Sequence, residues 1–99
     1  MKFENEPGRL TVHLTGEIDH HTARPTREKT DERIMKDKPK ELILDFSGVT
    51  FMDSSGVGLV MGRYKYAAAL GCKTAVKGLK ERDKKIMQMS GLSRLVEFR

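Results

Sequence analysis

The sequence predicts an α/β domain whose sheet is built from parallel β-α-β units. The stretch RLTVHL, Arg9 to Leu14, alternates apolar and polar residues, which is the period of a strand with one buried face. The stretch ELILDF, Glu41 to Phe46, carries apolar residues at consecutive positions, as in a central strand covered on both faces. Helical patterns separate the strands, and this order favours right-handed crossovers between parallel strands.

A hairpin is expected at the amino-terminal end. Pro7-Gly8 is a turn signal directly before the first long strand. The short stretch KFE, residues 2–4, would then pair with residues 9–14. A short edge strand therefore precedes the parallel part of the sheet.

The charged segment from Thr22 to Lys38 predicts the first helix, which ends before Pro39. Its apolar stripe is thin, and opposite charges stand four residues apart in two pairs, Arg27–Asp31 and Glu32–Lys36. Proline is tolerated in the first turn of a helix, so Pro25 favours Thr22 as the N-cap. We expect this helix to be the least firmly packed.

The stretch GVGLVMGRYKYAAAL, Gly56 to Leu70, predicts a second helix that is largely buried, because Arg63 is one of its few charged residues. Gly58 and Gly62 stand four residues apart on one face of this helix. Without side chains there, the helix backbone would approach the sheet closely.

The last third of the chain predicts a strand, a helix and a strand. Gly71 suits the residue that ends a helix, and KTAV, residues 73–76, follows as an interior strand. A third helix is expected over residues 80–90, closed by Gly91, with RLVEF, residues 94–98, as the final strand.

The composition is that of one ordinary globular domain spanning residues 1–99, with 37% hydrophobic and 33% charged residues. No apolar run approaches the about 20 residues of a membrane span, and the amino terminus lacks a signal-peptide pattern. We therefore expect a cytoplasmic protein with no membrane partner. The single cysteine, Cys72, is expected to be a small packing residue rather than a reactive thiol.

The formal net charge of +5 is unevenly placed along the chain. Residues 1–72 hold equal numbers of basic and acidic side chains, so the excess lies in residues 73–99. Nucleic-acid binding through this basic quarter is one interpretation. The stretch KGLKERDKK has no aromatic residue to stack on bases and contains two acidic residues, which favours a solvated helix face.

The stretch FMDSSGVG, Phe51 to Gly58, places two serines between an aspartate and a glycine where the second helix begins. Asp and Ser are preferred helix caps, so capping is one interpretation. A phosphorylation switch is the other, because a phosphate on a serine at a helix N-terminus can be carried without unfolding. A catalytic nucleophile is disfavoured, since neither G-x-S-x-G nor S-x-x-K is present.

The three histidines, His13, His20 and His21, could in principle supply a general base or metal ligands. No cysteine or histidine stands at the spacing of a zinc finger or of an i, i+4 helical pair of ligands. We therefore expect surface histidines, with no metal site and no cofactor.

Four stretches taken together resemble a known family: LTGEIDHHTA, FMDSSGVG, GRYK and MSGL, at residues 14–23, 51–58, 62–65 and 89–92. They are similar to the anti-sigma factor antagonists, which are single STAS domain proteins, and most of all to the sporulation antagonist of spore-forming Gram-positive bacteria. The resemblance implies a STAS-type mixed sheet with parallel β-α-β units and helices packed mainly on one face.

The resemblance implies a binding protein rather than an enzyme. In this family the unphosphorylated form binds an anti-sigma factor that is also a serine kinase, which frees the sigma factor. The kinase inactivates the antagonist by phosphorylation, and a serine phosphatase restores it. We expect these two protein partners, no direct contact with nucleic acid, and a monomer when the protein is free.

Carried onto this sequence, the first serine of DSSG is the phosphoacceptor, Ser54. Ile86 matches an apolar position near the partner surface, although core packing explains it equally well. The residues that the resemblance places at this surface are Asp19, Asp53, Ser54, Ser55, Gly56, Val57 and Ile86.

Two further expectations accompany the resemblance. Family members usually continue into another C-terminal helix, whereas this chain stops at Arg99, so we expect the sheet to be less covered there. The alternative function is a ligand-sensing STAS module that binds a nucleotide or another small anion at the helix N-terminus after Asp53.

Overall fold

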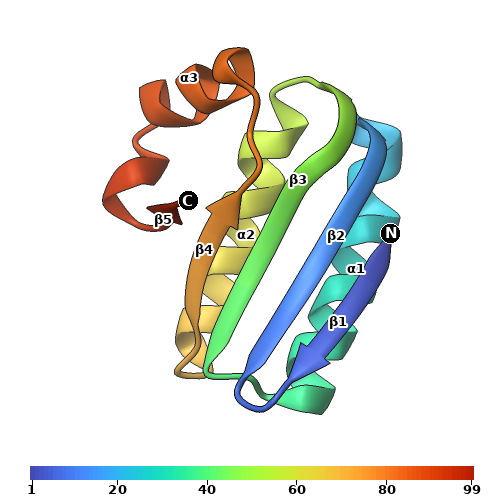
Figure 1. The fold of residues 1–99 in the computed structure, drawn as a ribbon, viewed down its shortest axis with the longest axis vertical. Coiled ribbons are helices and arrows are strands. Elements are labelled where there is room, and N and C mark those ends of the chain that lie inside the picture. Colours follow the sequence, from blue (N-terminus) through green and yellow to red (C-terminus); the bar gives the residue numbers. More distant parts are fainter.

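The computed structural model describes residues 1–99 and contains one five-stranded mixed sheet (Figure 1). Strands β1 (Lys2–Glu6) and β2 (Arg9–Ile18) are antiparallel, as the predicted hairpin requires. Strands β3 (Glu41–Met52), β4 (Lys73–Lys77) and β5 (Glu97–Phe98) continue the sheet in chain order, all parallel to β2. The predicted α/β class and mixed sheet are confirmed.

Two helices cover the same face of the sheet in Figure 1, α1 (His20–Asp37) and α2 (Ser55–Ala69). The third helix, α3 (Glu81–Met89), lies beyond the carboxyl end of β4 and leads through a 3₁₀ turn (Leu92–Arg94) to β5. A single apolar core fills the space between the sheet and the helices. Its strand residues alternate along β2 and β3: Leu10, Val12, Leu14, Leu42, Leu44 and Phe46.

The opposite face of the sheet carries no helix (Figure 1), yet residues 42–46 of the central strand β3 are all buried, as its consecutive apolar residues predict. Ile43 nevertheless is only 4% exposed on this open face, between Thr11 of β2 and Ala75 of β4. Long charged side chains from neighbouring strands lie on either side of this row. Their aliphatic stems can shield apolar surface while their charged ends stay in water.

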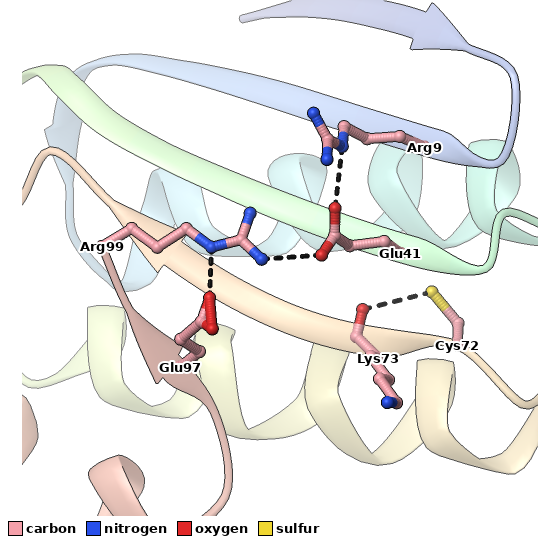
Figure 2. A network of polar contacts seen from close by, with 6 residues as sticks. All are labelled: Arg9, Glu41, Cys72, Lys73, Glu97 and Arg99. Carbon is pink, nitrogen blue, oxygen red and sulfur yellow. Dashed lines mark hydrogen bonds and ion pairs between the residues drawn. The ribbon is translucent and has the colours of Figure 1, made fainter.

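One row of charges on the open face appears in Figure 2, where Glu41 is the central acceptor. Its two carboxylate oxygens lie 2.7 Å from Arg9 Nε and 2.7 Å from Arg99 Nη2, and Arg99 also pairs with Glu97. The hydrogen bond from Arg99 is the main cause that lowers the pKa of Glu41, and the bond from Arg9 lowers it further. Burial raises this pKa, but the two bonds outweigh it, so the pKa lies below its ordinary value. This row joins β2, β3 and β5 across the open face.

The thiol of Cys72 lies beneath this region, and its Sγ contacts the Lys73 carbonyl oxygen (Figure 2). The residue is buried, and burial raises the pKa of the thiol to about 11. A thiol with that pKa remains protonated at neutral pH and is a poor nucleophile. The interpretation of Cys72 as a packing residue therefore agrees with its environment.

A second row on the open face is centred on His13. Its Nδ1 lies 2.7 Å from Asp45 Oδ2, and its Nε2 lies 2.8 Å from Glu4 Oε1. Hydrogen bonds to Glu4 and Asp45 raise the pKa of His13 above its ordinary value. The bond to His13 also lowers the pKa of Glu4. The imidazole therefore bridges β1 and β3 most effectively when it is charged and both carboxylates are ionised.

The His13 bridge should make stability depend on pH. A raised folded pKa adds stability that is fully present below the unfolded value of 6.5 and is lost as the pH rises through the folded pKa. The lowered Glu4 pKa adds stability above 4.5 that is lost as the pH falls. In urea denaturation, His13→Gln should therefore lose most relative to wild type between pH 4.5 and 6.5, and least near pH 8.5. A loss that is the same at every pH would contradict the charged bridge.

The first helix starts earlier than predicted, because its N-cap is Asp19 and not Thr22. Thr22 is the third residue of the helix and completes a capping box with Asp19. Pro25 consequently lies inside the helix, in its second turn, rather than in the first turn. Residue Asp31 does not pair with Arg27 as predicted; it forms an ion pair with Arg63 of α2.

The strands also differ in length from those predicted. Strands β2 and β3 continue to Ile18 and Met52, with register shifts between His13 and Thr15 and between Gly16 and Glu17, where β3 contributes one extra residue each time. Such bulges insert a residue and keep the pairing going beyond an interruption. The predicted final strand over residues 94–98 is reduced to two residues, because its first part forms the 3₁₀ turn. The predicted third helix, ended by Gly91 in a left-handed conformation, is confirmed.

Candidate functional site

The candidate site lies where β2 and β3 end side by side. Ile18 and Met52 are register partners, and the Asp53 amide donates to the Ile18 carbonyl at 3.1 Å. Asp19 and Asp53 follow these residues: Asp19 is the N-cap of α1, and Asp53 stands two residues before the first residue of α2. The parallel strands thus bring two acidic residues, which are 34 positions apart in the sequence, to one edge of the sheet.

Asp53 holds the start of α2. Its Oδ1 accepts a hydrogen bond from the Ser55 backbone amide at 2.8 Å, and its carbonyl accepts one from Gly56 at 3.0 Å. Ser54 occupies the N-cap position, but its side chain makes no capping hydrogen bond and the residue is exposed. Asp53 therefore caps the helix, and the adjacent Ser54 keeps a hydroxyl that is free of this role.

The same arrangement bears on anion binding at this helix N-terminus. The Asp53 carboxylate already accepts the Ser55 amide. A negative side chain therefore stands where a small anion would have to approach the free amides of the first turn. This arrangement disfavours the alternative function, in which a small anion binds at the helix N-terminus after Asp53.

Asp19 is engaged in capping α1. Its Oδ1 accepts from the amides of His21 and Thr22, each at 2.9 Å, while its own amide donates to Thr22 Oγ1 at 2.9 Å. The hydrogen bond from the Thr22 amide is the main cause that lowers the pKa of Asp19. The carboxylate is therefore ionised and fixed in position, with Oδ2 free of hydrogen bonds to the rest of the chain.

Gly56 is the glycine at which α2 approaches the sheet. A Cβ built on it would lie closer than 3.0 Å to the Sδ and Cγ atoms of Met52, which is fully buried. The prediction of a close approach at Gly58 and Gly62 is wrong, since a Cβ at either position meets nothing within 4 Å. Val57 is half-buried and packs against the core.

Alanine at Gly56 and at Gly58 should change stability in opposite directions. Alanine raises helix propensity by about 0.5–1 kcal/mol at either position. Gly56→Ala also displaces Met52 in a packed core, which costs about 1–3 kcal/mol. Urea denaturation should therefore show a net loss for Gly56→Ala and a gain for Gly58→Ala. Equal gains in both variants would mean that Met52 moves aside freely.

Helix α3 is fastened next to this segment by two basic side chains. Lys80 Nζ donates to the Val49 carbonyl at 2.5 Å, and Arg82 Nη1 donates to the Met52 carbonyl at 3.3 Å. Ile86 follows one turn later, half-buried and packed against the core. This contact gives Ile86 the packing role that was one of its two interpretations, and leaves part of its side chain exposed.

Two exposed apolar residues near these elements were not singled out by the sequence pattern. Phe51, at the end of β3, is 47% exposed, and Met89, at the end of α3, is 87% exposed. A strand residue next to a buried methionine and a residue at a helix end both look like core positions in sequence. The structure shows that both face outward.

The basic quarter is partly used within the fold. Lys80, Arg82 and Arg99 make the carbonyl and carboxylate contacts described above. The side chains that remain available to a nucleic acid are separated along β4, α3 and the 3₁₀ turn: Lys73, Lys77, Lys84, Lys85 and Arg94. This distribution agrees with the interpretation of a solvated face.

The three histidines lie in two places in the fold. His13 is committed to Glu4 and Asp45 on the open face, and the rings of His20 and His21 lie 4.1 Å apart at the start of α1. The structure contains no cluster of three or more His, Cys, Asp or Glu side chains placed to hold a metal ion. None of its helices is both long enough and apolar enough to span a membrane.

Comparison with known proteins shows matches over the whole chain. Residues 1–99 match the family model described as STAS domain. The anti-sigma F factor antagonist of Paenibacillus polymyxa is 35% identical over 96 residues, which cover 97% of this chain and 82% of that protein. The fold is similar to that of the anti-sigma factor antagonist SpoIIAA in its unphosphorylated form, with a TM-score of 0.84 and 31% identity over 99% of this chain and 86% of that one.

A second solved structure is that of the Bacillus cell fate determinant SpoIIAA in the phosphorylated form. It has a TM-score of 0.77 and 31% identity over 99% of this chain and 89% of that one. These comparisons confirm the STAS-type fold that the four sequence stretches predicted.

Proposed function

This chain belongs to the STAS domain family, among the anti-sigma factor antagonists, and we propose that it binds an anti-sigma factor and so releases a sigma factor. The proposal is supported by 35% and 36% identity to two relatives named anti-sigma F factor antagonist, over 97% and 84% of this chain. It makes the protein a binding module rather than an enzyme.

We further propose that phosphorylation of Ser54 controls this binding. The observation that carries the proposal is that, at the start of α2, one residue makes the capping hydrogen bond and its neighbour does not. Asp53 caps the helix through the Ser55 amide, whereas the Ser54 hydroxyl is exposed and makes no capping bond. The hydroxyl can therefore enter a kinase active site without loss of a structural contact. The likeness to a protein known in unphosphorylated and phosphorylated forms supports the same proposal.

A phosphate at Ser54 would act through charge and bulk at the partner surface. It adds about −1.5 to −2 charges next to Asp53 and close to the capped Asp19. Because the Ser54 side chain makes no capping hydrogen bond, the added group removes no contact within the fold, and the domain stays folded. The anti-sigma factor would then face an anionic surface instead of a hydroxyl, and the complex would weaken.

We assign the partner surface to the edge that carries both caps. Asp19, Asp53, Ser54 and Ser55 supply its polar groups, and Val57 and Ile86 supply partly exposed apolar area. Gly56 is buried and acts by fixing the shape of the segment. The proposed partners are an anti-sigma factor with serine kinase activity and a serine phosphatase that removes the phosphate.

The test is reconstitution with the cognate anti-sigma factor. In gel filtration, the unphosphorylated protein should co-elute with the anti-sigma factor and displace a bound sigma factor. Addition of ATP should add one phosphate, which mass spectrometry should place on Ser54. Failure to bind would reject antagonism itself; binding without phosphate transfer, or transfer to another residue, would reject only the switch.

A further inference from the structure

Arg82, in the first turn of α3, lies beside the segment that carries Ser54. Its Nη1 donates to the carbonyl of Met52, which stands two residues before Ser54. Two residues of chain span at most about 7 Å, so the guanidinium and the Ser54 backbone are close neighbours. Figure 1 shows the same proximity, with α3 next to the start of α2. A cation of α3 is therefore about one side-chain length from the proposed phosphoacceptor.

The guanidinium of Arg82 is held in place through one nitrogen and keeps its other donors free. Nη1 makes both of its contacts, to the Met52 carbonyl at 3.3 Å and to Asp83 Oδ1 at 3.1 Å. Nε and Nη2 make no hydrogen bond within the chain, and the side chain is 65% exposed. A guanidinium is planar, and its Nε and one Nη form an edge that matches two oxygens of a phosphate. Arg82 is thus positioned next to the segment with a two-point donor site unused.

The edge that carries Ser54 has acidic neighbours that are fixed in position. Asp53 accepts the Ser55 amide, and Asp19 accepts the first amides of α1. A phosphate on Ser54 would add about −1.5 to −2 charges beside these carboxylates. A cation that pairs with the phosphate would reduce the repulsion within the folded domain.

The other cations near this segment are less suitably placed. Arg24 of α1 lines a groove to which Ser55 contributes and Ser54 does not. Lys80 of the turn before α3 is engaged with a carbonyl of β3. Arg82 therefore carries the free donors on the α3 side of Ser54.

We propose that Arg82 forms an ion pair, within the same chain, with the phosphate of phosphorylated Ser54. This inference rests on the proposed phosphorylation of Ser54 and adds the residue that receives the phosphate. Nη1 keeps its contact with the Met52 carbonyl, while Nε and Nη2 donate to two phosphate oxygens. The pair links α3 to the start of α2 in the phosphorylated form alone. Phosphorylation then changes the connections within the partner surface as well as its charge.

The test introduces phosphoserine at position 54 during translation, so it needs no kinase. The second pKa of the phosphate, ordinarily about 6, is measured by phosphorus NMR at constant ionic strength. An ion pair favours the dianion, so this pKa should be higher in Arg82→Gln than in the otherwise wild-type phosphoprotein, by about 0.5. Arg82→Lys keeps the charge without the two-point geometry and should give an intermediate value.

Lys84→Gln is the matched control. It removes the same charge from α3, but about 200° around the helix from Arg82, and should leave the phosphate pKa within about 0.1 of the wild-type value. Arg24→Gln tests the cation on the other side of the segment and should also leave it unchanged. The proposal is overturned if Arg82→Gln leaves the phosphate pKa unchanged, or if Lys84→Gln or Arg24→Gln raises it as much as Arg82→Gln does.

A second measurement separates the ion pair from effects on the fold. Arg82→Gln loses the Met52 contact in both forms, so the comparison is the drop in thermal midpoint that phosphoserine causes in each variant. This drop should be larger in Arg82→Gln than in wild type or Lys84→Gln, by about 3 °C. Equal drops in all three would also overturn the ion pair. Failure of a kinase to phosphorylate Ser54 would reject the switch alone and leave both measurements intact.

Discussion

Ser54→Ala should take up no phosphate from the cognate anti-sigma factor kinase while its complex with that protein persists in the presence of ATP. The Ser54 hydroxyl makes no capping bond, so its loss should change the free energy of unfolding by less than about 0.5 kcal/mol. The effect on phosphorylation is all-or-none, because alanine has no hydroxyl. Radiolabel from ATP, followed over time, measures it directly.

Ser55→Ala is the matched control for this variant. Asp53 accepts a hydrogen bond from the Ser55 backbone amide and not from its hydroxyl, so alanine at position 55 keeps the cap. This variant should be phosphorylated at position 54 like the wild type. If Ser55→Ala loses phosphate uptake and Ser54→Ala retains it, the assignment of the acceptor is reversed.

Ser54→Asp tests the electrostatic part of the switch. Its single charge, next to Asp53, should weaken the complex with the anti-sigma factor in the direction of phosphorylation. The decrease should shrink as salt is added, since exposed charges are screened within about 10 Å at 0.1 M ionic strength. A decrease that is insensitive to salt would indicate that bulk, rather than charge, separates the partners.

The sequence patterns predicted which elements form, whereas their limits depended on distant contacts. The thin pattern around Pro25 pointed to Thr22 as the cap, because proline belongs in a first turn. In the structure β2 continues to Ile18 past two register shifts, at which β3 carries an extra residue, so the chain reaches α1 at Asp19. The capping box then uses both Asp19 and Thr22, and the helix includes Pro25.

The sequence predicted which segment forms the site, but it did not predict the structural role of each residue in that segment. Asp53 and Ser54 both suit a cap, and only the geometry shows that Asp53 makes the bond. Gly56 and Gly58 are two residues apart, about 200° around a helix, so only one of them can face the sheet. Arg63 reads as a solvent position, yet it is buried, because α1 supplies Asp31 across the helix pair.

Gly78→Ala should be the most destabilising alanine substitution among the glycines in left-handed conformation. Gly78 joins β4 to α3 with φ +75°, and a Cβ there would lie 2.7 Å from both Asp45 Oδ1 and the Ser47 amide nitrogen. Those two atoms form a hydrogen bond of 3.0 Å. The variant combines left-handed strain of about 1–2 kcal/mol with disruption of this part-buried hydrogen bond, about 3 kcal/mol in total.

Gly71→Ala separates the two causes. Gly71 has the same φ of +75°, but a Cβ there meets nothing within 4 Å, so only the backbone strain remains, about 1 kcal/mol. Thermal unfolding followed by circular dichroism should give a midpoint about 12 °C or more below wild type for Gly78→Ala, and a smaller shift for Gly71→Ala. Equal shifts would show that the Asp45–Ser47 turn yields to the added methyl group. A larger shift for Gly78→Ala would mean that this turn resists the methyl group, so that its hydrogen bond is lost in addition to the backbone strain.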